Sequence, residues 1–376
     1  MRLFLTIFFS LFLAGGAAAQ GLELGAVLPL TGPSASTGQA AEAALAASVR
    51  DLLRSGVDAR LSVLDSRGNP DYAAVQLQKL LSMGVHALVC CETADLLGRL
   101  GPLAEAANVP TFVLAPRSVP SSWLFPLQGG DTGALTRLAL EPALAPLALM
   151  APTGSAGDGA EAVLTAGLAT LSAGSVRYPS GRTPLTPEAL TAATLEPRGV
   201  VVWDSAAGSL EAAGALAARG FTGTTVVRAA VWDELSALER AGLTGAVSVV
   251  SPAVLGYTLP DAHPSKEAAS SLRRALGGLS AAQTGEAVAV AAAAWDAGQL
   301  LGAAAEQVLT YTDPADTGTA GLRSALRDAL VGLGPVVGAG GTYDFTEDAA
   351  GTVGGGVLAE SLVLAARQGG GFRPLP

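Results

Sequence analysis

The sequence contains few of the side chains that carry covalent or metal chemistry. It has two cysteines, two histidines and, among its 22 basic residues, only the lysines Lys79 and Lys266. Neither lysine follows a glycine-rich loop, so the chain has no phosphate-binding P-loop. The Cys and His residues lack the spacing of a zinc site, and there is no G-x-S-x-G nucleophile elbow. We therefore expect a protein that is not an enzyme, with no catalytic residue, no metal and no cofactor.

Positive charge is also scarce. The 22 Lys and Arg residues face 32 Asp and Glu residues, which gives a formal net charge of −10. Proteins that bind nucleic acids or anionic membrane surfaces present basic patches. We expect neither partner for this chain.

The two cysteines, Cys90 and Cys91, are adjacent. They are too few for a disulfide framework. In an oxidising compartment they form either a strained ring between neighbours or a pair of buried thiols at a strand end. Disulfide geometry is unfavourable between adjacent residues, which favours the thiols.

The first residues have the pattern of a secretory signal peptide. Arg2 supplies the positive charge, residues 3–14 an apolar core, and residues 17–19 (Ala-Ala-Ala) a small-residue cleavage site. We expect residues 1–19 to be removed. No cysteine follows the apolar core, so we expect no lipid anchor, and no later stretch reaches the roughly 20 apolar residues of a membrane span. The mature chain is expected to be a soluble periplasmic protein.

The rest of the chain alternates between strand-like and helix-like segments. Val- and Leu-rich runs typical of buried strands lie at 22–28, 59–65, 85–90, 110–115, 146–151, 199–204 and 224–229, with two shorter ones at 246–251 and 340–345. Helical patterns follow these strands, including 94–107, 158–172, 208–219, 265–276 and 284–309. Such alternation predicts an α/β protein with two doubly wound parallel sheets. We place the boundary between the two series near 140–146, where two prolines occur.

The stretch GAVLPLTGPSASTGQ (25–39) ends a predicted strand in a group of hydroxyl residues. Ser36 followed by Gln39 matches a capping box, which predicts a helix start there. Asn69 and Pro70 form a second helix start, as an N-cap and a first-turn proline. Ligands of open parallel sheets bind beyond the carboxyl ends of the strands. This cluster of hydroxyl residues therefore belongs either to an ordinary turn or to one wall of a polar ligand site.

Several segments, in this order, carry a resemblance to a known family. They are GAVLPLTGPSASTGQAAEAAL, LSVLDSRGNPDYAAVQLQKLLSMGVHALV, LAEAANVPTFVLAPRS, AAGALAARGFTGTTVV, AWDAGQLL and GGTYDFTEDAAG. The set resembles the leucine/isoleucine/valine-binding type of periplasmic solute receptor, which serves ABC importers. The resemblance implies a Venus-flytrap fold in which two α/β lobes, joined by three crossover segments, close on a small ligand. It divides the chain into 21–143 plus 253–332 and 144–252 plus 333–376.

The resemblance also implies ligand positions in the first lobe. Amino-acid receptors of this type offer an aromatic ring after the first strand, where this sequence has Thr37. The loop after the third strand binds a carboxylate through hydroxyl and N–H groups, and Thr93 and Ala94 fall there. The loop after the fourth strand places Ala115 and Arg117 at the wall of the site.

In the second lobe the sequence departs from the family pattern. The tyrosine expected before a glycine is replaced by Ala156, and the acidic partner of a ligand ammonium is not met before Asp233. Without such a carboxylate a buried ammonium is costly. Trp203 and Trp232 offer flat apolar surfaces, and Asp204 follows the same strand as Trp203.

These arguments give one candidate ligand set: Ser36, Thr37, Thr93, Ala94, Ala115, Arg117, Trp203, Asp204 and Trp232. Each residue also has an ordinary structural interpretation, as a helix cap, a surface ion pair or a core side chain. Arg117 suits a carboxylate bidentately, so we expect a small carboxylate or a neutral organic solute. In the same way, Asp296 is expected at a helix surface and His86 in a surface position or loop.

We expect a monomeric receptor that hands its solute to an ABC permease in the inner membrane. The alternative is a sensor or accessory protein of the same fold that acts without transport. Neighbouring ATPase and permease genes would favour import.

Overall fold

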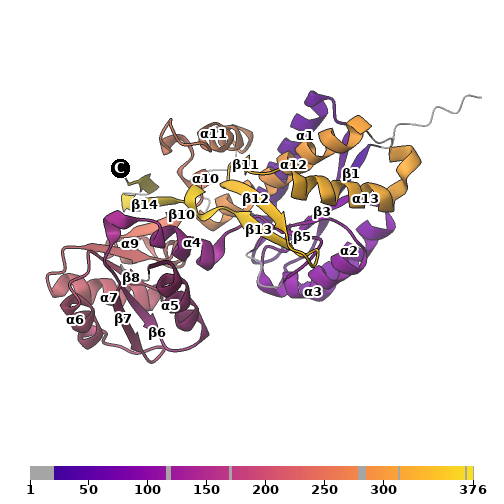
Figure 1. Cartoon of the computed structure of the whole chain (residues 1–376). Helices are drawn as coiled ribbons and strands as arrows, with labels where there is room; N and C mark the ends of the chain where they lie inside the picture. Colours follow the sequence, from indigo (N-terminus) through magenta and orange to yellow (C-terminus); the bar gives the residue numbers. More distant parts are fainter. Residues whose placement is uncertain are drawn as a thin grey trace, which may run out of the picture.

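The structure, a computed structural model, describes residues 21–115, 120–168, 172–277, 285–311, 314–368 and 371–375. The expected signal peptide (1–19) and Arg117 lie outside these residues. The described chain forms two α/β units side by side, each built on its own sheet (Figure 1). The two-lobe α/β architecture expected from the sequence is therefore confirmed.

The first unit contains a five-stranded parallel sheet in the order β2-β1-β3-β4-β5. Its strands are β1 (Leu22–Leu28), β2 (Ala59–Asp65), β3 (Ala87–Cys90), β4 (Thr111–Val113) and β5 (Leu124–Pro126). The helices around it are α1 (Ala35–Ser55), α2 (Pro70–Ser82), α3 (Ala94–Ala106), α11 (Lys266–Ala275), α12 (Gly285–Tyr311) and α13 (Pro314–Gly332), with the short α10 (Pro252–Leu255) and η2 (Gly256–Thr258) nearby.

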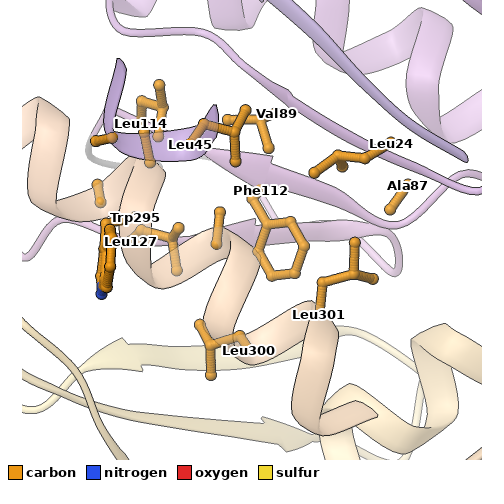
Figure 2. Packing of buried hydrophobic residues seen from close by; sticks show 14 of the residues in the cluster. Leu24, Leu45, Ala87, Val89, Phe112, Leu114, Leu127, Trp295, Leu300 and Leu301 are labelled. Carbon is orange, nitrogen blue, oxygen red and sulfur yellow. The ribbon is translucent and has the colours of Figure 1, made fainter. Parts of the chain in front are cut away.

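Helix α12 is the core element of this unit. Figure 2 shows the ring of Phe112 from β4 next to Leu300 and Leu301 of α12. α12 is long and apolar enough to cross a membrane by length and composition, but 83% of its most apolar window is buried inside the protein. Asp296 on this helix is 1% exposed, so the expected surface position is wrong. His86 lies in the loop before β3, one of the two expected placements, but it is buried, at 3% exposure.

The second unit contains a seven-stranded sheet in the order β15-β14-β10-β9-β8-β6-β7. Its strands are β6 (Leu147–Pro152), β7 (Ser172–Tyr178), β8 (Gly199–Val202), β9 (Thr224–Val227), β10 (Val247–Val250), β14 (Val363–Gln368) and β15 (Gly371–Pro374). The first five are parallel, and β14 and β15 are antiparallel additions. Its helices are α4 (Gly130–Ala139), η1 (Pro142–Leu144), α5 (Ser155–Leu168), α6 (Thr186–Thr194), α7 (Ala206–Ala218), α8 (Val231–Glu234), α9 (Ala237–Ala241) and η3 (Ala359–Ser361).

A third, small antiparallel sheet is formed by β11 (Val336–Val337), β12 (Thr342–Glu347) and β13 (Val353–Val357). Tyr343 and Phe345 of β12 belong to the core of the first unit, whereas Leu135 and Leu138 of α4 belong to a core of the second. The lobe boundaries at residues 143 and 332, which the family resemblance implies, remain a proposal. The packing favours boundaries at 126–130 and 357–362, with a third crossing at 250–252 between β10 and α10.

Two helix starts can be compared with expectation. The Asn69 side chain accepts a hydrogen bond from Tyr72 N, with Pro70 at the first position of α2, so this start is confirmed. Helix α1, in contrast, begins at Ala35 after Ser34, with no side-chain cap. Gln39 donates to the carbonyl oxygen of Leu30 instead. The predicted capping box at Ser36 is therefore wrong.

Candidate ligand-binding cleft

The hydroxyl-rich loop after β1 is held mainly by Asp65 at the end of β2. Thr31 Oγ1 donates to Asp65 Oδ2 over 2.6 Å, and the backbone N–H groups of Leu30 and Thr31 donate to Oδ1. Ser36 is exposed and Thr37 is half-buried at the start of α1. Some of the hydroxyl-bearing residues of this loop thus have a structural role. The side chain of Ser36 reaches solvent at the carboxyl edge of the sheet.

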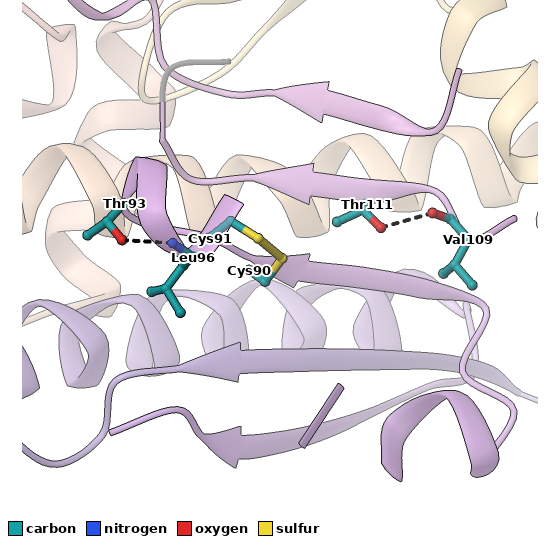
Figure 3. Close-up of a disulfide and its surroundings, with 6 residues drawn as sticks. All are labelled: Cys90, Cys91, Thr93, Leu96, Val109 and Thr111. Carbon is teal, nitrogen blue, oxygen red and sulfur yellow. Dashed lines mark hydrogen bonds between the residues drawn. A yellow bond between two sulfur atoms is a disulfide. The ribbon is translucent and has the colours of Figure 1, made fainter. Parts of the chain in front are cut away.

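The adjacent cysteines lie at the end of β3, where Cys90 is its last residue and Cys91 begins the following loop. They are joined in a disulfide, and Cys90 and Cys91 are 0% and 1% exposed. The preference for free thiols is therefore wrong, although the expected burial is correct. Cys91 has a φ of 69°, a left-handed conformation that turns the chain toward α3. Figure 3 shows the disulfide at the end of β3, with Thr93 Oγ1 accepting from Leu96 N over 3.3 Å.

Thr93 and Ala94 are exposed at the N-terminus of α3. Between them and the disulfide lies Glu92, whose two carboxylate oxygens are buried with no hydrogen-bond partner in the described part of the chain. Burial raises the pKa of Glu92 to about 7. Ala115, after β4, is 2% exposed and offers little surface to a ligand.

The expected residues of the second unit have different surroundings. The Asp204 carboxylate accepts from Tyr178 Oη over 2.9 Å and from Ser205 N over 2.6 Å. Trp232 is 1% exposed, and its Nε1–H donates to Ser248 Oγ over 2.8 Å. Its indole is thus a satisfied core side chain. Trp203 is 4% exposed, and the Arg228 guanidinium carbon lies 5.7 Å from the centroid of its ring.

A cavity of about 260 Å³ lies where the chain crosses between the two units. Each crossing contributes to its wall, through Gln128, Ser251 and Val357. The second unit adds Trp203 and the loop after β9, and the first unit adds the start of α12. The described residues of the wall are Leu127, Gln128, Gly129, Gly130, Asp131, Ala134, Trp203, Arg228, Ala229, Ala230, Asp233, Val249, Val250, Ser251, Val254, Gly285, Glu286, Ala289, Gly340, Val357, Leu362 and Phe372.

Of the residues expected from the sequence to bind ligand, Trp203 lines this cavity and the other described ones do not. Sequence reasoning missed Arg228, Gln128 and Glu286. Arg228 carried a readable signal, because it is the first residue after β9, at the carboxyl edge where parallel sheets bind ligands. Glu286 had none, since it lies in the first turn of a predicted Ala-rich helix and not at the end of a strand.

The charged groups of the cavity are partly paired. Arg228 contacts Asp131 twice, with Nη2 3.1 Å from Oδ2 and Nε 3.4 Å from Oδ1. Asp233 accepts hydrogen bonds from Gly285 N and Glu286 N at the start of α12. Partial burial, with the nearby charges of Asp233 and Glu234, raises the pKa of Glu286. Such an arrangement can hold a solute by contacts from both units, with apolar walls and a few polar anchors.

Comparison with known proteins agrees with this architecture. The profile of a periplasmic binding protein family matches residues 21–360. The chain therefore belongs to the periplasmic binding proteins, of the type I class to which leucine/isoleucine/valine receptors belong. A search of curated proteins finds no match.

Solved structures with similar folds cover nearly the whole chain. An extracellular ligand-binding receptor from Rhodopseudomonas palustris is 19% identical, with a TM-score of 0.65 over 94% of this chain and 99% of its own. A leucine-binding protein from Thermotoga maritima is 14% identical, with a TM-score of 0.61 over 94% and 98%. An ABC transporter solute-binding protein from R. palustris, in complex with benzoate, is 17% identical, with a TM-score of 0.56 over 94% and 95%. At these identities the likeness is one of fold.

Proposed function

We propose that the protein is an extracytoplasmic receptor that binds a small organic solute between its two units and delivers it to an ABC permease in the inner membrane. The observation that supports this most is the cavity at the three crossings, whose wall comes from both units. A solute that contacts both units stabilises the arrangement in which they are close together. The units then form one surface for the permease to recognise. No step of this cycle requires covalent chemistry.

The proposed solute is a small carboxylate or a neutral compound. Related folds include a leucine-binding protein and a protein in complex with benzoate; leucine carries an ammonium beside its carboxylate, whereas benzoate carries a carboxylate alone. Asp233 is the acidic residue nearest the position that binds an ammonium in amino-acid receptors, and it lines the cavity. Its oxygens already accept two backbone hydrogen bonds, which disfavours an α-amino acid.

The proposed contacts are Trp203, together with Arg228 and Gln128, at the cavity. We retain Ser36, Thr37, Thr93 and Ala94 as proposed contacts for a more closed arrangement, because they stand at the carboxyl edge of the first sheet. Asp204 is retained for the same reason on the second sheet. Trp232 is left out because its indole is buried and hydrogen-bonded within the core.

A thermal-shift screen of the mature chain tests the binding function. Amino acids, organic acids, amides and alcohols are compared, each well above its expected dissociation constant. A true ligand raises the free energy of unfolding by roughly 2.7 kcal/mol at a hundredfold excess over Kd. The proposal fails if no solute raises Tm, or if a solute that does so is chemically converted by the purified protein.

We also propose that residues 1–19 direct export and are removed, leaving a monomer in the periplasm without a lipid anchor. N-terminal sequencing of the periplasmic fraction should start at Gln20. Light scattering of that material should give the mass of one chain. Recovery in the membrane fraction with a modified N-terminus would contradict this proposal.

A further inference from the structure

The basic side chain in the cavity wall favours a ligand that carries a negative charge. Among the described lining residues, Arg228 is the one that carries positive charge; Asp131, Asp233 and Glu286 are acidic, and the rest of the wall is largely apolar. The apolar part includes Ala134, Val249, Val254 and Phe372. The 22 basic residues of the chain are outnumbered by acidic ones, which gives a net charge of −10. A basic residue in the cavity wall is therefore a distinctive feature.

Asp131, the ion-pair partner of Arg228, is the side chain that a ligand could replace in this site. The Asp131 side chain, in the first turn of α4, is 55% exposed, whereas the Arg228 side chain is 32% exposed. A guanidinium has five N–H donors, and Asp131 is reached by Nε and Nη2. Nη1 has no hydrogen-bond partner among the described residues. The Asp131 carboxylate can turn into solvent. The guanidinium is then free to form a bidentate contact with another carboxylate.

The other acidic residues of the cavity, Asp233 and Glu286, are less suited to bind a cationic ligand than Arg228 is to bind an anionic one. Asp233 is bound to two N–H groups at the positive end of the 27-residue helix α12. Partial burial and the nearby charges of Asp233 and Glu234 raise the pKa of Glu286, so its carboxyl is easier to protonate than an exposed one. Arg228 therefore remains the charged group that is best placed to gain a new partner.

Two aromatic side chains line the cavity. The guanidinium lies over the ring of Trp203, and Phe372 lines the same cavity. The volume of about 260 Å³ lies below the roughly 300–1,000 Å³ typical of pockets for drug-sized ligands. It suits a body of about one ring, and ring–ring contacts add to the area that is buried.

We propose that the Arg228–Trp203 side of the cavity binds the carboxylate of a single-ring aromatic monocarboxylate, which replaces Asp131 as the partner of Arg228. This inference rests on the proposed function, since it names the solute class of the same cleft. Asp131 acts as an internal competitor that keeps the guanidinium paired while the cleft is empty. A dicarboxylate would leave its second charge beside Asp233 and Glu286, so a single carboxylate is favoured.

Calorimetry with benzoate as the probe tests the proposal. Benzamide provides a neutral compound of the same shape, benzylamine a cationic one, and L-leucine an amino acid. We expect benzoate to bind at least about tenfold more tightly than benzamide, because a charge-assisted bidentate contact is lost in the amide. Benzylamine and L-leucine should bind more weakly than benzoate.

Three variants connect this preference to the residues. Arg228→Gln should weaken benzoate binding by about tenfold or more and leave benzamide binding unchanged. Asp131→Asn should strengthen benzoate binding, an increase that a purely structural role of the Arg228–Asp131 pair does not predict. Arg54→Gln, in an exposed pair on α1, is the matched control and should change neither. Circular dichroism and Tm confirm that each variant is folded.

The outcomes separate this inference from the function beneath it. If L-leucine or a neutral solute binds tightly and Arg228→Gln has no effect, the carboxylate subsite is wrong and the receptor function stands. Unchanged or weaker benzoate binding in a folded Asp131→Asn protein overturns the exchange of partners. If no compound of this set or of the wider thermal-shift panel binds, the receptor function fails as well.

Discussion

The carboxylate of Asp233 in α8 accepts a hydrogen bond from the backbone N–H of Glu286, 3.0 Å away, in the first turn of α12. α8 packs in the core of the second unit and α12 in that of the first, so this contact joins the two units beside the cavity. The free N–H groups of a helix start favour an acidic partner. Asp233 thus acts as a cap supplied by the opposite unit.

Asp233→Asn should loosen this contact while preserving the shape of the side chain. Removing the negative charge from a helix N-terminus costs about 1 kcal/mol, which here weakens the contact between units. Small-angle scattering of the ligand-free protein should show a larger radius of gyration. Asp71→Asn, in an exposed surface pair with Arg99, is the control. Identical scattering of Asp233→Asn and wild type would show that the crossings alone set the spacing.

Asp296 holds the glycine-rich segment before β12 onto α12. Its oxygens accept from Ala339 N, Gly340 N and Tyr343 Oη, each over 2.7 Å. Burial raises the pKa of Asp296 to about 6, against the opposing effect of these hydrogen bonds. Between the ordinary value of 3.8 and about 6 the folded state holds more protons than the unfolded one, so this group makes stability fall as pH rises through that window.

Tyr343→Phe removes one of the three donors to Asp296. We expect a loss of about 1–2 kcal/mol in the free energy of unfolding by urea at pH 7. Because the remaining carboxylate is less well solvated, the pKa of Asp296 should rise further and the fall of stability should extend to higher pH. Tyr311→Phe, at a side chain that is 89% exposed, should change neither quantity. Equal pH profiles for Tyr343→Phe and wild type would refute the link between the two groups.

The first three βα units and β4 could be predicted, because LELGAVL (22–28) is an almost continuously buried strand, ARLSVLD (59–65) is a Val- and Leu-rich edge strand, and the helices that follow show clear periodicity. β5 spans three residues, and β15 has Gly and Pro at its ends, so neither carries a strand pattern. Two of the donors to Asp296 are backbone groups more than 40 residues away, a relationship that no local pattern contains.

The candidate site was predictable in position but less so in detail. The strand-end argument led to Trp203, but it missed Arg228 because the predicted strand 224–229 includes this residue, whereas β9 ends at Val227. Trp232 looked equally available in sequence. Its indole N–H pairs with Ser248, a strand residue whose inward orientation is set by the three-dimensional packing.

Glu92 gives a second pH-dependent prediction. Burial raises its pKa to about 7 from an ordinary value of 4.5, so folding takes up a proton and stability falls as pH rises from about 4.5 to about 7. Glu92→Gln removes this charge. Its stability relative to wild type should therefore increase with pH through that interval, as measured by urea unfolding at pH 5, 6, 7 and 8. A constant difference between the two proteins across this range would mean that folding does not raise the pKa of Glu92.

The close approach of α1 and α12 depends on glycine at Gly302. A Cβ there would overlap Leu52 Cδ2 of α1, so the Leu52 side chain or the helices themselves would have to move. Gly302→Ala should therefore destabilise the protein by about 1–3 kcal/mol, as overpacking of a core does. Gly214→Ala in α7 is the matched control, because nothing lies within 4 Å of its added Cβ. That change should stabilise by roughly 0.5–1 kcal/mol through helix propensity. Chemical denaturation compares the two, and a stabilising Gly302→Ala would mean that the α1–α12 interface can separate without loss.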